Sequence, residues 1–500
     1  MPNLHCFVRK LVNGIGVTFL SSALITGLPA SAAGLNDTGI NTCSDFVYNE
    51  LACPVTGLEG QDAEYGTNHF DFTKLDASGN DLWVTASTHV CVRDNVTKLI
   101  WEVKTDDHSL RDKGWTYTWY DSGAPGGNPG VGNGGNCHDT SRCDTEKYVQ
   151  DVNAAGLCGF KDWRMPTVKE LTGIVDFSRQ DSIDPGYFPN TPSSRFWSST
   201  PHASYSDGAW YVSFDLGYVS SESRTTAYPV RLVRGAKTVD SFVDNGNGTV
   251  SDNNTGLMWA KCCEGLSGAG CATGSATPLE GTPAMSAARN STLAGYDDWH
   301  MPNVKELQSL VDYGVSSPSI NSTFFPNFPS DVVWSNSPAV DANYGVWGVT
   351  FGDGAVGSGG RTAANAVCLV RGTGGTNDVL TLQSNSPSIV GTGAGNDTYV
   401  LAPNTLTSTT NLTLSDTQGS NVLQLVAGLS ITKSEVAATA IRLTLDNGGK
   451  VTLLGADAFN FIVGGNTTPM TYAAFSQNIL KVTVPTTGIV IGGPVTITNP

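Results

Sequence analysis

Residues 162–171 read DWRMPTVKEL, and residues 298–307 repeat them as DWHMPNVKEL. All but two of the aligned positions are identical. Two segments of this length and similarity in one chain indicate an internal duplication. The stretch predicts a turn that leads into a short helix, and the rest of the chain can be placed relative to its two copies.

Other landmarks recur in the same order on both sides of this stretch. The paired positions are Trp101 with Trp259, Trp197 with Trp334, Trp210 with Trp347, Phe214 with Phe351, Arg224 with Arg361, and residues 233–235 with residues 370–372. This period is too long for a solenoid repeat and has the size of a domain. We therefore predict two tandem domains, at residues 83–236 and 237–373.

Each copy of the stretch carries the start signal of a helix. Thr167 and Glu170 have the spacing of a capping box, and Asn303 stands three residues before Glu306 in the second copy. Apolar residues then follow at helical spacing, so one side of each helix is expected to pack on a core. Later in each copy apolar and polar residues alternate, which predicts a half-buried strand. Each domain should therefore be α+β.

The N-terminus predicts export. Arg9 and Lys10 precede an apolar run, and residues 30–32 read Ala-Ser-Ala, the small residues of a cleavage site, so residues 1–32 are predicted to be a signal peptide. An uncleaved anchor helix is the alternative. The protein is thus expected to be secreted or held at the cell surface, with a membrane only as a neighbouring surface.

The charge of the chain excludes one class of partner. It has 28 basic and 45 acidic residues, a net charge of −17. Nucleic acids and other polyanions are bound by Lys and Arg that release counterions, so we expect no nucleic-acid partner.

An exported chain with an even number of cysteines predicts disulfides. Cys6 leaves with the signal and ten cysteines remain, while the absence of a CxxC motif disfavours zinc. Cys271 can pair with Cys262 or Cys263; we choose Cys262, which leaves the pairing of Cys263 and Cys368 open. The predicted bonds are Cys43–Cys53, Cys91–Cys158, Cys137–Cys143 and Cys262–Cys271.

Two further regions flank the tandem domains. Residues 33–82 are polar and rich in Gly and Asp, so we predict a small disulfide-pinned N-terminal segment without its own core. Residues 374–500 contain no Cys and no Trp, and their short alternating runs are rich in Thr, Asn, Val and Leu. This composition predicts a separate all-β domain.

Two acidic loops carry the oxygen donors that calcium prefers. Residues 391–400 resemble one calcium-binding repeat of RTX-type secreted proteins, but a single turn supplies only part of a calcium cage, and a Gly-rich β-turn is favoured. Residues 244–252 lack the bidentate Glu of an EF-hand, which favours an Asn-Gly hairpin. No cofactor is certain and calcium is the candidate. Its ligands would be Asp244, Asn247, Asp252 and Asp397.

The repeated turn and helix, the strand patterns FWSS at residues 196–199 and AWYVSF at 209–214, and the closing Val-Arg-Gly carry a family likeness. Together they resemble the C-terminal domain of the Legionella collagen-like adhesin, a family of exported bacterial proteins, over just over half of the chain. The order of elements is also similar to the C-type-lectin-like superfold. The implied fold class is α+β, with two tandem C-type-lectin-like domains followed by an all-β C-terminal domain.

The resemblance implies adhesion, but not to every ligand of the family. A chain this acidic repels the sulfated glycosaminoglycans that the family is known to bind. The sugar-and-calcium signatures of true C-type lectins, Glu-Pro-Asn and Trp-Asn-Asp, are also missing.

No catalytic pattern stands out. HExxH and GxSxG are absent, and no histidine recurs at matching positions of the two copies. The recurring carboxylates suit turns, caps and helix surfaces, and the recurring tryptophans suit a core better than a sugar-stacking surface. We therefore expect a protein that is not an enzyme.

A ligand surface is expected in loops beyond the core, where polar and aromatic residues alternate. Arg224 and Arg361 can equally bridge strands. We predict an exported non-enzymatic binding protein or adhesin that recognises a glycan or a protein partner, and an oligomer is compatible with the sequence; the alternative is a structural envelope or fibre component whose repeats serve assembly. The candidate ligand-binding residues are Tyr205, Asp207, Tyr211, Tyr218, Arg224, Asn343, Tyr344, Asp353 and Arg361.

Overall fold

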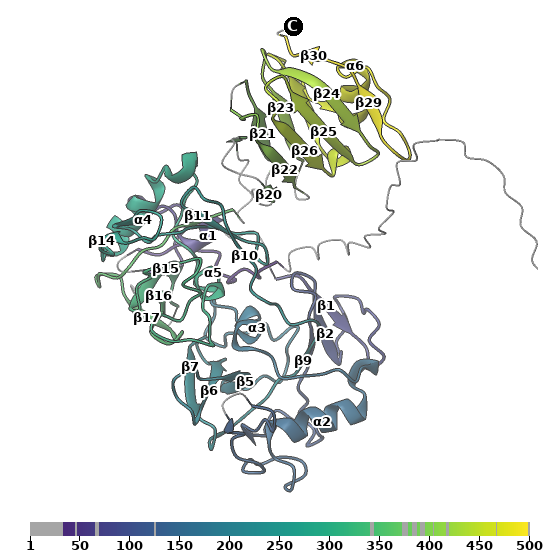
Figure 1. The fold of residues 1–500 in the computed structure, drawn as a ribbon. Helices are drawn as coiled ribbons and strands as arrows, with labels where there is room; N and C mark the ends of the chain where they lie inside the picture. The colour runs from purple at the N-terminus through teal and green to yellow at the C-terminus, as the bar shows by residue number, and fades with distance from the viewer. Residues whose placement is uncertain are drawn as a thin grey trace, which may run out of the picture.

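The computed structural model describes residues 34–45, 48–65, 70–124, 127–340, 345–372, 379–382, 388–390, 396–403, 405–416, 420–466 and 468–498 (Figure 1). The predicted signal peptide, Asn343, Tyr344 and residues 391–395 of the RTX-like motif lie outside these ranges. Within them, none of the helices has the length and apolar character needed to cross a membrane.

Among its described residues, the first copy contributes to three antiparallel sheets, one of them the short pair β4-β8, and has two α-helices and one 3₁₀ helix. One sheet has the order β1-β2-β3-β9, and a meander of β5, β6 and β7 packs against the capped helix α3. The elements are β1 (Phe72–Leu75), β2 (Cys91–Asp94), β3 (Ile100–Glu102), β4 (Tyr117–Thr118), α2 (Thr145–Ala155), η2 (Leu157–Gly159), α3 (Val168–Gly173), β5 (Arg195–Pro201), β6 (Gly208–Ser213), β7 (Val219–Ser223), β8 (Ala227–Tyr228) and β9 (Val233–Arg234).

The second copy repeats this order with shorter loops. Its first sheet runs β10-β11-β12-β18, and β15, β16 and β17 form the meander beside the capped helix α5. The elements are β10 (Phe242–Asp244), β11 (Thr249–Asp252), β12 (Met258–Ala260), β13 (Leu266–Ser267), β14 (Thr273–Gly274), α4 (Gly281–Arg289), η3 (Leu293–Gly295), α5 (Val304–Ser309), β15 (Val332–Pro338), β16 (Gly345–Thr350), β17 (Val356–Gly360) and β18 (Val370–Arg371). Strands outweigh helices throughout, so the fold is mostly β.

Both predicted capping boxes are confirmed. The Thr167 hydroxyl accepts a hydrogen bond from the Glu170 amide at 3.2 Å, and the Glu170 carboxylate accepts one from the Thr167 amide at 2.8 Å. Asn303 and Glu306 make the same reciprocal pair. These bonds satisfy amides that have no partner inside a helix, which fixes where each short helix begins.

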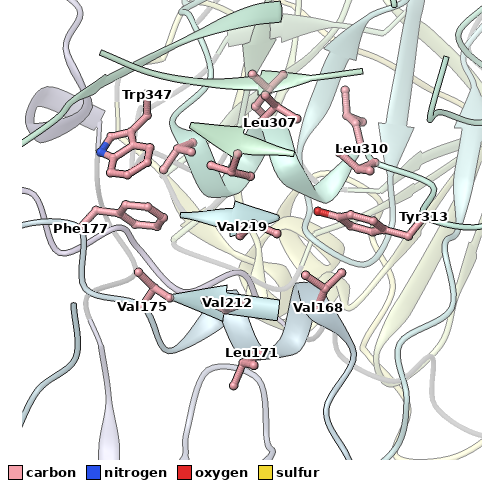
Figure 2. Packing of buried hydrophobic residues seen from close by; sticks show 14 of the residues in the cluster. Val168, Leu171, Val175, Phe177, Val212, Val219, Leu307, Leu310, Tyr313 and Trp347 are labelled. Atoms are coloured by element: carbon pink, nitrogen blue, oxygen red, sulfur yellow. The ribbon is translucent and has the colours of Figure 1, made fainter. Parts of the chain in front are cut away.

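The two copies share one sheet and one core. Antiparallel pairing of β7 with β17, at Val219 and Val356, joins the meanders into a six-stranded sheet of order β15-β16-β17-β7-β6-β5. Apolar side chains of both copies meet on its face (Figure 2), in a single cluster of buried residues. The paired valines occupy equivalent positions in the duplication, so the junction has the pattern of a two-fold symmetric interface.

Aromatic rings are exchanged across this junction. The Phe177 ring packs edge-on against Trp347 of the second copy, with ring centres 5.1 Å apart. The equivalent residue Tyr313 packs in the same way against Trp210 of the first copy, at 5.0 Å. Figure 2 shows the Phe177–Trp347 pair on one side of Val219 and Tyr313 on the other. Each copy thus completes the core of the other.

The lysine of the repeated stretch also joins the copies. Lys169 Nζ donates to the Ser309 carbonyl at the end of α5, at 2.8 Å, and Lys305 Nζ donates to the Gly173 carbonyl at the end of α3, at 3.0 Å. A cation at the C-terminal carbonyls of a helix is favourable because those carbonyls lack partners and carry partial negative charge. The exchange explains why the same lysine recurs.

The N-terminal segment covers the second copy, although the first copy follows it in the chain. Its helix α1 (Asp62–Tyr65) lies among the elements of the second copy in Figure 1. The Tyr65 ring stacks on His300 at 4.3 Å, and Leu58 is buried in the cluster that contains Trp299. Asp62 is buried and hydrogen bonds to the Ser337 hydroxyl. The segment therefore has no core of its own: Leu58 and Tyr65 pack on the second copy, while β1 at its end pairs with β2 of the first copy.

Asp62 is expected to make the stability depend on pH. Burial, and next the charge of Asp37, raise the pKa of Asp62 from 3.8 to about 8. The folded state thus holds a proton that the unfolded chain releases above pH 4, so stability falls as pH rises from 4 to 8. Asp62→Asn should remove this slope and stabilise the protein at pH 8 by on the order of 3 kcal/mol, as measured by denaturant unfolding at several pH values.

An exposed carboxylate provides the control for this experiment. Asp81 pairs with Arg93 at 2.7 Å, which lowers the pKa of Asp81. Asp81→Asn should therefore leave the slope above pH 5 unchanged. Parallel stability curves for the wild type and Asp62→Asn would contradict the assignment.

Five disulfides are present. Four join the cysteine pairs named from the sequence, Cys43–Cys53, Cys91–Cys158, Cys137–Cys143 and Cys262–Cys271. The fifth joins Cys263 to Cys368 across the second copy. In the first copy Arg231 occupies the position of Cys368 and binds the Glu102 carbonyl at 2.8 Å, so a disulfide replaces a buried polar contact.

The described strands from residue 379 onward form two sheets. The strands β19, β21, β23 and β27 pair in parallel, and so do β20, β22 and β26. The chain alternates between the two sheets, so the domain is a coil of parallel β-strands with an inserted hairpin, and we call it the β coil. It also contains a helix, α6, which the all-β prediction did not include. The elements are β19 (Val379–Thr381), β20 (Ser388–Val390), β21 (Thr398–Leu401), β22 (Asn411–Ser415), β23 (Val422–Leu425), β24 (Ser430–Val436), β25 (Ala440–Leu445), β26 (Lys450–Leu454), η4 (Ala456–Ala458), β27 (Asn460–Val463), β28 (Met470–Thr471), α6 (Tyr472–Asn478), β29 (Val490–Gly492) and β30 (Val495–Thr496).

Candidate functional site

The loop between β5 and β6 holds the ring of His202 in one tautomer. The His202 Nδ1 atom accepts hydrogen bonds from the backbone amides of Ser204 and Tyr205, at 3.2 and 3.1 Å. An imidazole nitrogen that accepts two amides carries no proton, so in the neutral ring the proton is on Nε2. The loop therefore presents an N–H donor.

His202 lies where the two copies meet. Its ring is parallel to the Trp210 indole, with centres 5.0 Å apart, and Trp210 in turn contacts Tyr313 of the second copy. Burial lowers the pKa of His202, and the negative charge of Asp353 opposes this effect. Burial dominates, so His202 is neutral at pH 7. The second copy thus contributes Tyr313, which packs against Trp210, and the charge of Asp353, which acts on His202 in a loop of the first copy.

The rest of the loop adds an exposed ring and a second carboxylate. Tyr205 is 43% exposed and lies beside His202, with ring centres 6.2 Å apart. The Asp207 carboxylate accepts a hydrogen bond at 2.7 Å from Asn128 Nδ2, which belongs to the long glycine-rich loop of the first copy. Asn128 is held in turn by Arg224, which donates to its carbonyl. The loop is therefore braced rather than free.

We call this surface the junction face and define it by Asn128, His202, Tyr205, Asp207 and Asp353. It combines an exposed aromatic ring, an imidazole donor and two carboxylate acceptors on a rigid base. Aromatic faces and converging donors and acceptors are the features with which proteins bind hydroxyl-rich or polar ligands. It brings together three residues predicted from the sequence, Tyr205, Asp207 and Asp353.

The other predicted residues have structural partners. Tyr211 is buried under the Arg195 guanidinium, which lies 4.9 Å from the ring centre. The Tyr218 hydroxyl hydrogen bonds to Ser358 of the second copy at 2.7 Å. Arg224 is buried against the Trp119 ring. These three residues hold the scaffold together, and Arg224 supports the junction face from beneath through its hydrogen bond to the Asn128 carbonyl.

Arg361 is the counterpart of Arg224, but its partner differs. It is buried and donates to the Ser44 hydroxyl of the N-terminal segment. The N-terminal segment thus takes, in the second copy, the place that the glycine-rich loop takes in the first. Both arginines bridge elements, which is the structural alternative that the sequence left open.

In the described part of the second copy, the histidine of the junction face has no counterpart. Ala339 aligns with His202, and its carbonyl accepts a hydrogen bond from Asn49 Nδ2 at 3.2 Å. The N-terminal segment therefore covers the equivalent edge. Sequence reasoning missed His202 because it counted only histidines that recur in both copies; its position three residues before the predicted Tyr205 was the available signal.

The acidic loop at residues 244–252 forms the hairpin of β10 and β11. Asp244 pairs with Lys261 at 2.7 Å, and the Asn247 side chain accepts from the Thr249 hydroxyl at the same distance. The Asp252 carboxylate accepts from the backbone amide of Asn254. These contacts direct the oxygens at neighbouring amides and hydroxyls rather than toward a common point.

Asp397 lies in a turn of the β coil. Its amide donates to the Asn421 side chain at 2.9 Å, and the residue is buried. In the part of the chain that the structure describes, no three His, Cys, Asp or Glu side chains are close enough to hold a metal ion. The expected calcium ligands therefore do not converge there.

One buried cluster of ionisable groups resembles an active site in composition only. Lys104 Nζ lies 3.0 Å from both the Glu102 carboxylate and the Tyr148 hydroxyl, and burial lowers the pKa of Lys104 and raises that of Tyr148. All three side chains are at most 1% exposed, and the cluster bonds to itself and to the backbone. It stabilises the interior of the first copy and offers no group to a substrate.

The comparisons with known proteins identify the duplicated unit. The family described as the Lcl C-terminal domain matches the chain at residues 90–234 and again at residues 248–371. The matched segments begin at β2 and β11 and end at β9 and β18, which are equivalent elements of the two copies. The resemblance carried by the repeated stretch is thereby confirmed. No curated protein and no solved structure matches the chain.

Proposed function

Because the chain belongs to the Lcl C-terminal domain family, with two copies that cover more than half of it, we propose that it is an exported, adhesin-like protein. The predicted signal peptide and the five disulfides support a location outside the cell, secreted or at the surface. Its role is to bind a glycan or a protein partner, without catalysis. The C-type-lectin-like superfold is part of this proposal and rests on the order of elements.

The junction face is the observation that carries the proposed binding role. It is a braced loop with an exposed tyrosine, and both copies contribute to it. Its charged members are Asp207 and Asp353, and His202 is neutral, so it offers no positive charge to a sulfate or phosphate. We therefore propose a neutral, hydroxyl-rich glycan as the ligand, with a protein surface as the alternative outcome. Single-site affinity would be modest, and display of several copies would raise it.

A glycan array with the mature protein, with and without calcium, tests the proposal. We expect binding to neutral sugars in both conditions, and binding that changes little with salt, because no ion pair with the ligand is involved. Silence across the array, together with binding to a protein partner, would exclude the glycan.

Substitutions in the loop are expected to weaken ligand binding. Tyr205→Ala removes the exposed ring, and His202→Ala removes the N–H donor; each should weaken binding about tenfold or more, which corresponds to about 1.4 kcal/mol. Isothermal titration with the array-identified sugar measures the effect. Tyr48→Ala is the matched control, since Tyr48 is 64% exposed on the N-terminal segment. Equal binding by all three variants would show that the junction face is not the binding site.

A structural role in an envelope or fibre is the second candidate. The edge strand β29 carries Ile491, which is 62% exposed, and Ile489 just before it is 65% exposed. Exposed apolar edge strands favour pairing with another chain. Light scattering distinguishes the two roles, because ordered polymers that form without ligand and disappear in Ile491→Lys would favour assembly.

A further inference from the structure

A pocket lies between the two copies, beside the capped helices α3 and α5. It encloses about 850 Å³, including the part that is open to solvent. The lining comes from the ends of both helices, from the turns after β2 and β11, from the linker between the copies and from the N-terminal segment. The pocket shares no residue with the junction face, and neither copy forms it alone.

Gln308, near the end of α5, carries an amide of fixed orientation into this lining. The residue is only 3% exposed. Its Nε2 atom donates to the Tyr313 hydroxyl at 2.9 Å, and that hydroxyl donates its own proton to the Gly354 carbonyl at 3.0 Å, so the amide cannot be turned around. Among the described residues, none donates a hydrogen bond to Gln308 Oε1. A buried acceptor without a donor is costly, so this oxygen favours a partner in the pocket.

Asn254, in the turn after β11, adds a second oxygen of the same kind. Its Nδ2 atom donates to the Val239 carbonyl at 2.6 Å, which again fixes the orientation of the amide. In the described part of the chain, no group donates to Asn254 Oδ1, and the residue lines the pocket. The pocket therefore holds two amide oxygens that can accept from a ligand.

The duplication shows that the fold does not require these amides. Thr172 stands at the position of Gln308 in the first copy, and its hydroxyl donates to the Val168 carbonyl of its own helix at 2.9 Å. Val96 stands at the position of Asn254. The second copy thus departs from the first at two positions of the lining, and each departure adds an acceptor to the pocket.

Two hydroxyl groups of the first copy supply donors. The hydroxyl oxygens of Thr97 and Thr167 each accept from a backbone amide, that of Leu99 at 3.4 Å and that of Glu170 at 3.2 Å. Neither hydroxyl donates its proton to a described residue. Both threonines line the pocket, so their protons can be donated to a ligand.

The charged side chains of the lining already have partners in the protein. Glu170 pairs with an arginine at 2.7 Å, and Asp240 pairs with Lys169 at 3.3 Å. Lys305 donates to two backbone carbonyls, and both carboxylate oxygens of Asp252 accept hydrogen bonds. A charged ligand would enter without an opposite charge to pair with, which is costly in a partly buried site.

We propose that this pocket binds a small uncharged ligand with several hydroxyl groups, of the class of a monosaccharide or a cyclitol. A hydroxyl both donates and accepts, so one kind of group matches the amide oxygens and the threonine hydroxyls together. The side chains of Leu35 and Leu99 in the lining suit the C–H groups of such a ring. A ligand at this site contacts both copies and the N-terminal segment at once.

Ligand-observed NMR titration of the mature protein tests the proposal. The probes are glucose, galactose, N-acetylglucosamine and myo-inositol, with glucosamine and glucuronate as charged counterparts of glucose. We expect at least one neutral probe to bind, and both charged probes to bind more weakly. Gln308→Thr and Asn254→Val restore the residues of the first copy, and each should weaken binding about fivefold, the effect of one lost hydrogen bond.

Two controls separate this site from its surroundings and from the junction face. Asn253→Ala changes an exposed amide of the same turn that lies outside the lining, and it should leave binding of the probe unchanged. Tyr205→Ala alters the junction face and should also leave it unchanged. The pocket and the proposed adhesin role therefore succeed or fail separately.

A thermal shift gives a second readout. A ligand that binds only the folded protein raises its melting temperature. We expect the neutral probe to raise the melting temperature of the wild type and to have no effect on the double variant Gln308→Thr, Asn254→Val. Without ligand the double variant should melt close to the wild type, because the first copy folds with these residues. Absence of binding by every neutral probe, unchanged affinity in the two single variants, or tighter binding of a charged probe would each overturn the proposal.

Discussion

Deleting residues 34–65 is expected to unfold the second copy and to destabilise the core that both copies share. The deletion uncovers the cluster around Trp299 that buries Leu58, and it leaves the buried Arg361 without its Ser44 partner. Loss of a covering segment and of a partner to a buried charge are among the largest single effects on stability. We expect a loss of more than about 5 kcal/mol, which is the whole stability of a marginal domain.

Thermal unfolding followed by tryptophan fluorescence measures this loss. The matched control is truncation after Gly372, which removes the β coil and should leave the transition of the two copies unchanged. A synthetic peptide of residues 34–65, with Cys43 and Cys53 oxidised, should restore the transition when added to the deleted protein. If the second copy melts at the same temperature without the segment, the segment lies on its surface without stabilising it.

Trp347→Ala should destabilise both copies at once, by about 3 to 5 kcal/mol. Trp347 is fully buried, and its ring contacts Phe177 and Tyr218 of the first copy at 5.1 and 5.0 Å. The substitution leaves a cavity in the shared core, so neither copy can retain its native packing. The two copies are therefore expected to unfold in one cooperative transition.

Calorimetry and denaturant titration check this expectation. Trp83→Ala is the control, because Trp83 is 86% exposed and its loss should change stability by less than about 0.5 kcal/mol. The β coil has its own cluster of buried residues and should keep its own transition in both variants. Separate transitions for the two tandem copies would show that the shared sheet does not couple them.

The junction face shows where recurrence helped and where it misled. Tyr205 and Asp207 were found because polar and aromatic residues alternate in a loop of the first copy. His202 was missed because Ala339 replaces it in the second copy. Asp353 was assigned to a surface of the second copy, but it acts on His202 of the first. A site formed between copies has no reason to recur within each of them.

The sequence by itself determined the local structure and the family. Capping residues, apolar spacing and short-range cysteine pairs act within a few positions of the chain, so Thr167 with Glu170, and Asn303 with Glu306, specified the helix starts without any distant contact. The recurrence of the stretch at residues 162–171 indicated two tandem domains and identified the family.

Only the tertiary structure decided which surfaces meet. Nothing in the local sequence distinguishes the lysines of the repeated stretch from lysines on an exposed helix surface. In the structure, Lys169 and Lys305 each bind the C-terminal end of the other copy's helix. The segment before the first copy covers the second, more than 200 residues away, as in the contact of Asp62 with Ser337. Such contacts depend on how two finished units pack, and packing joins residues whose separation along the chain carries no local signal.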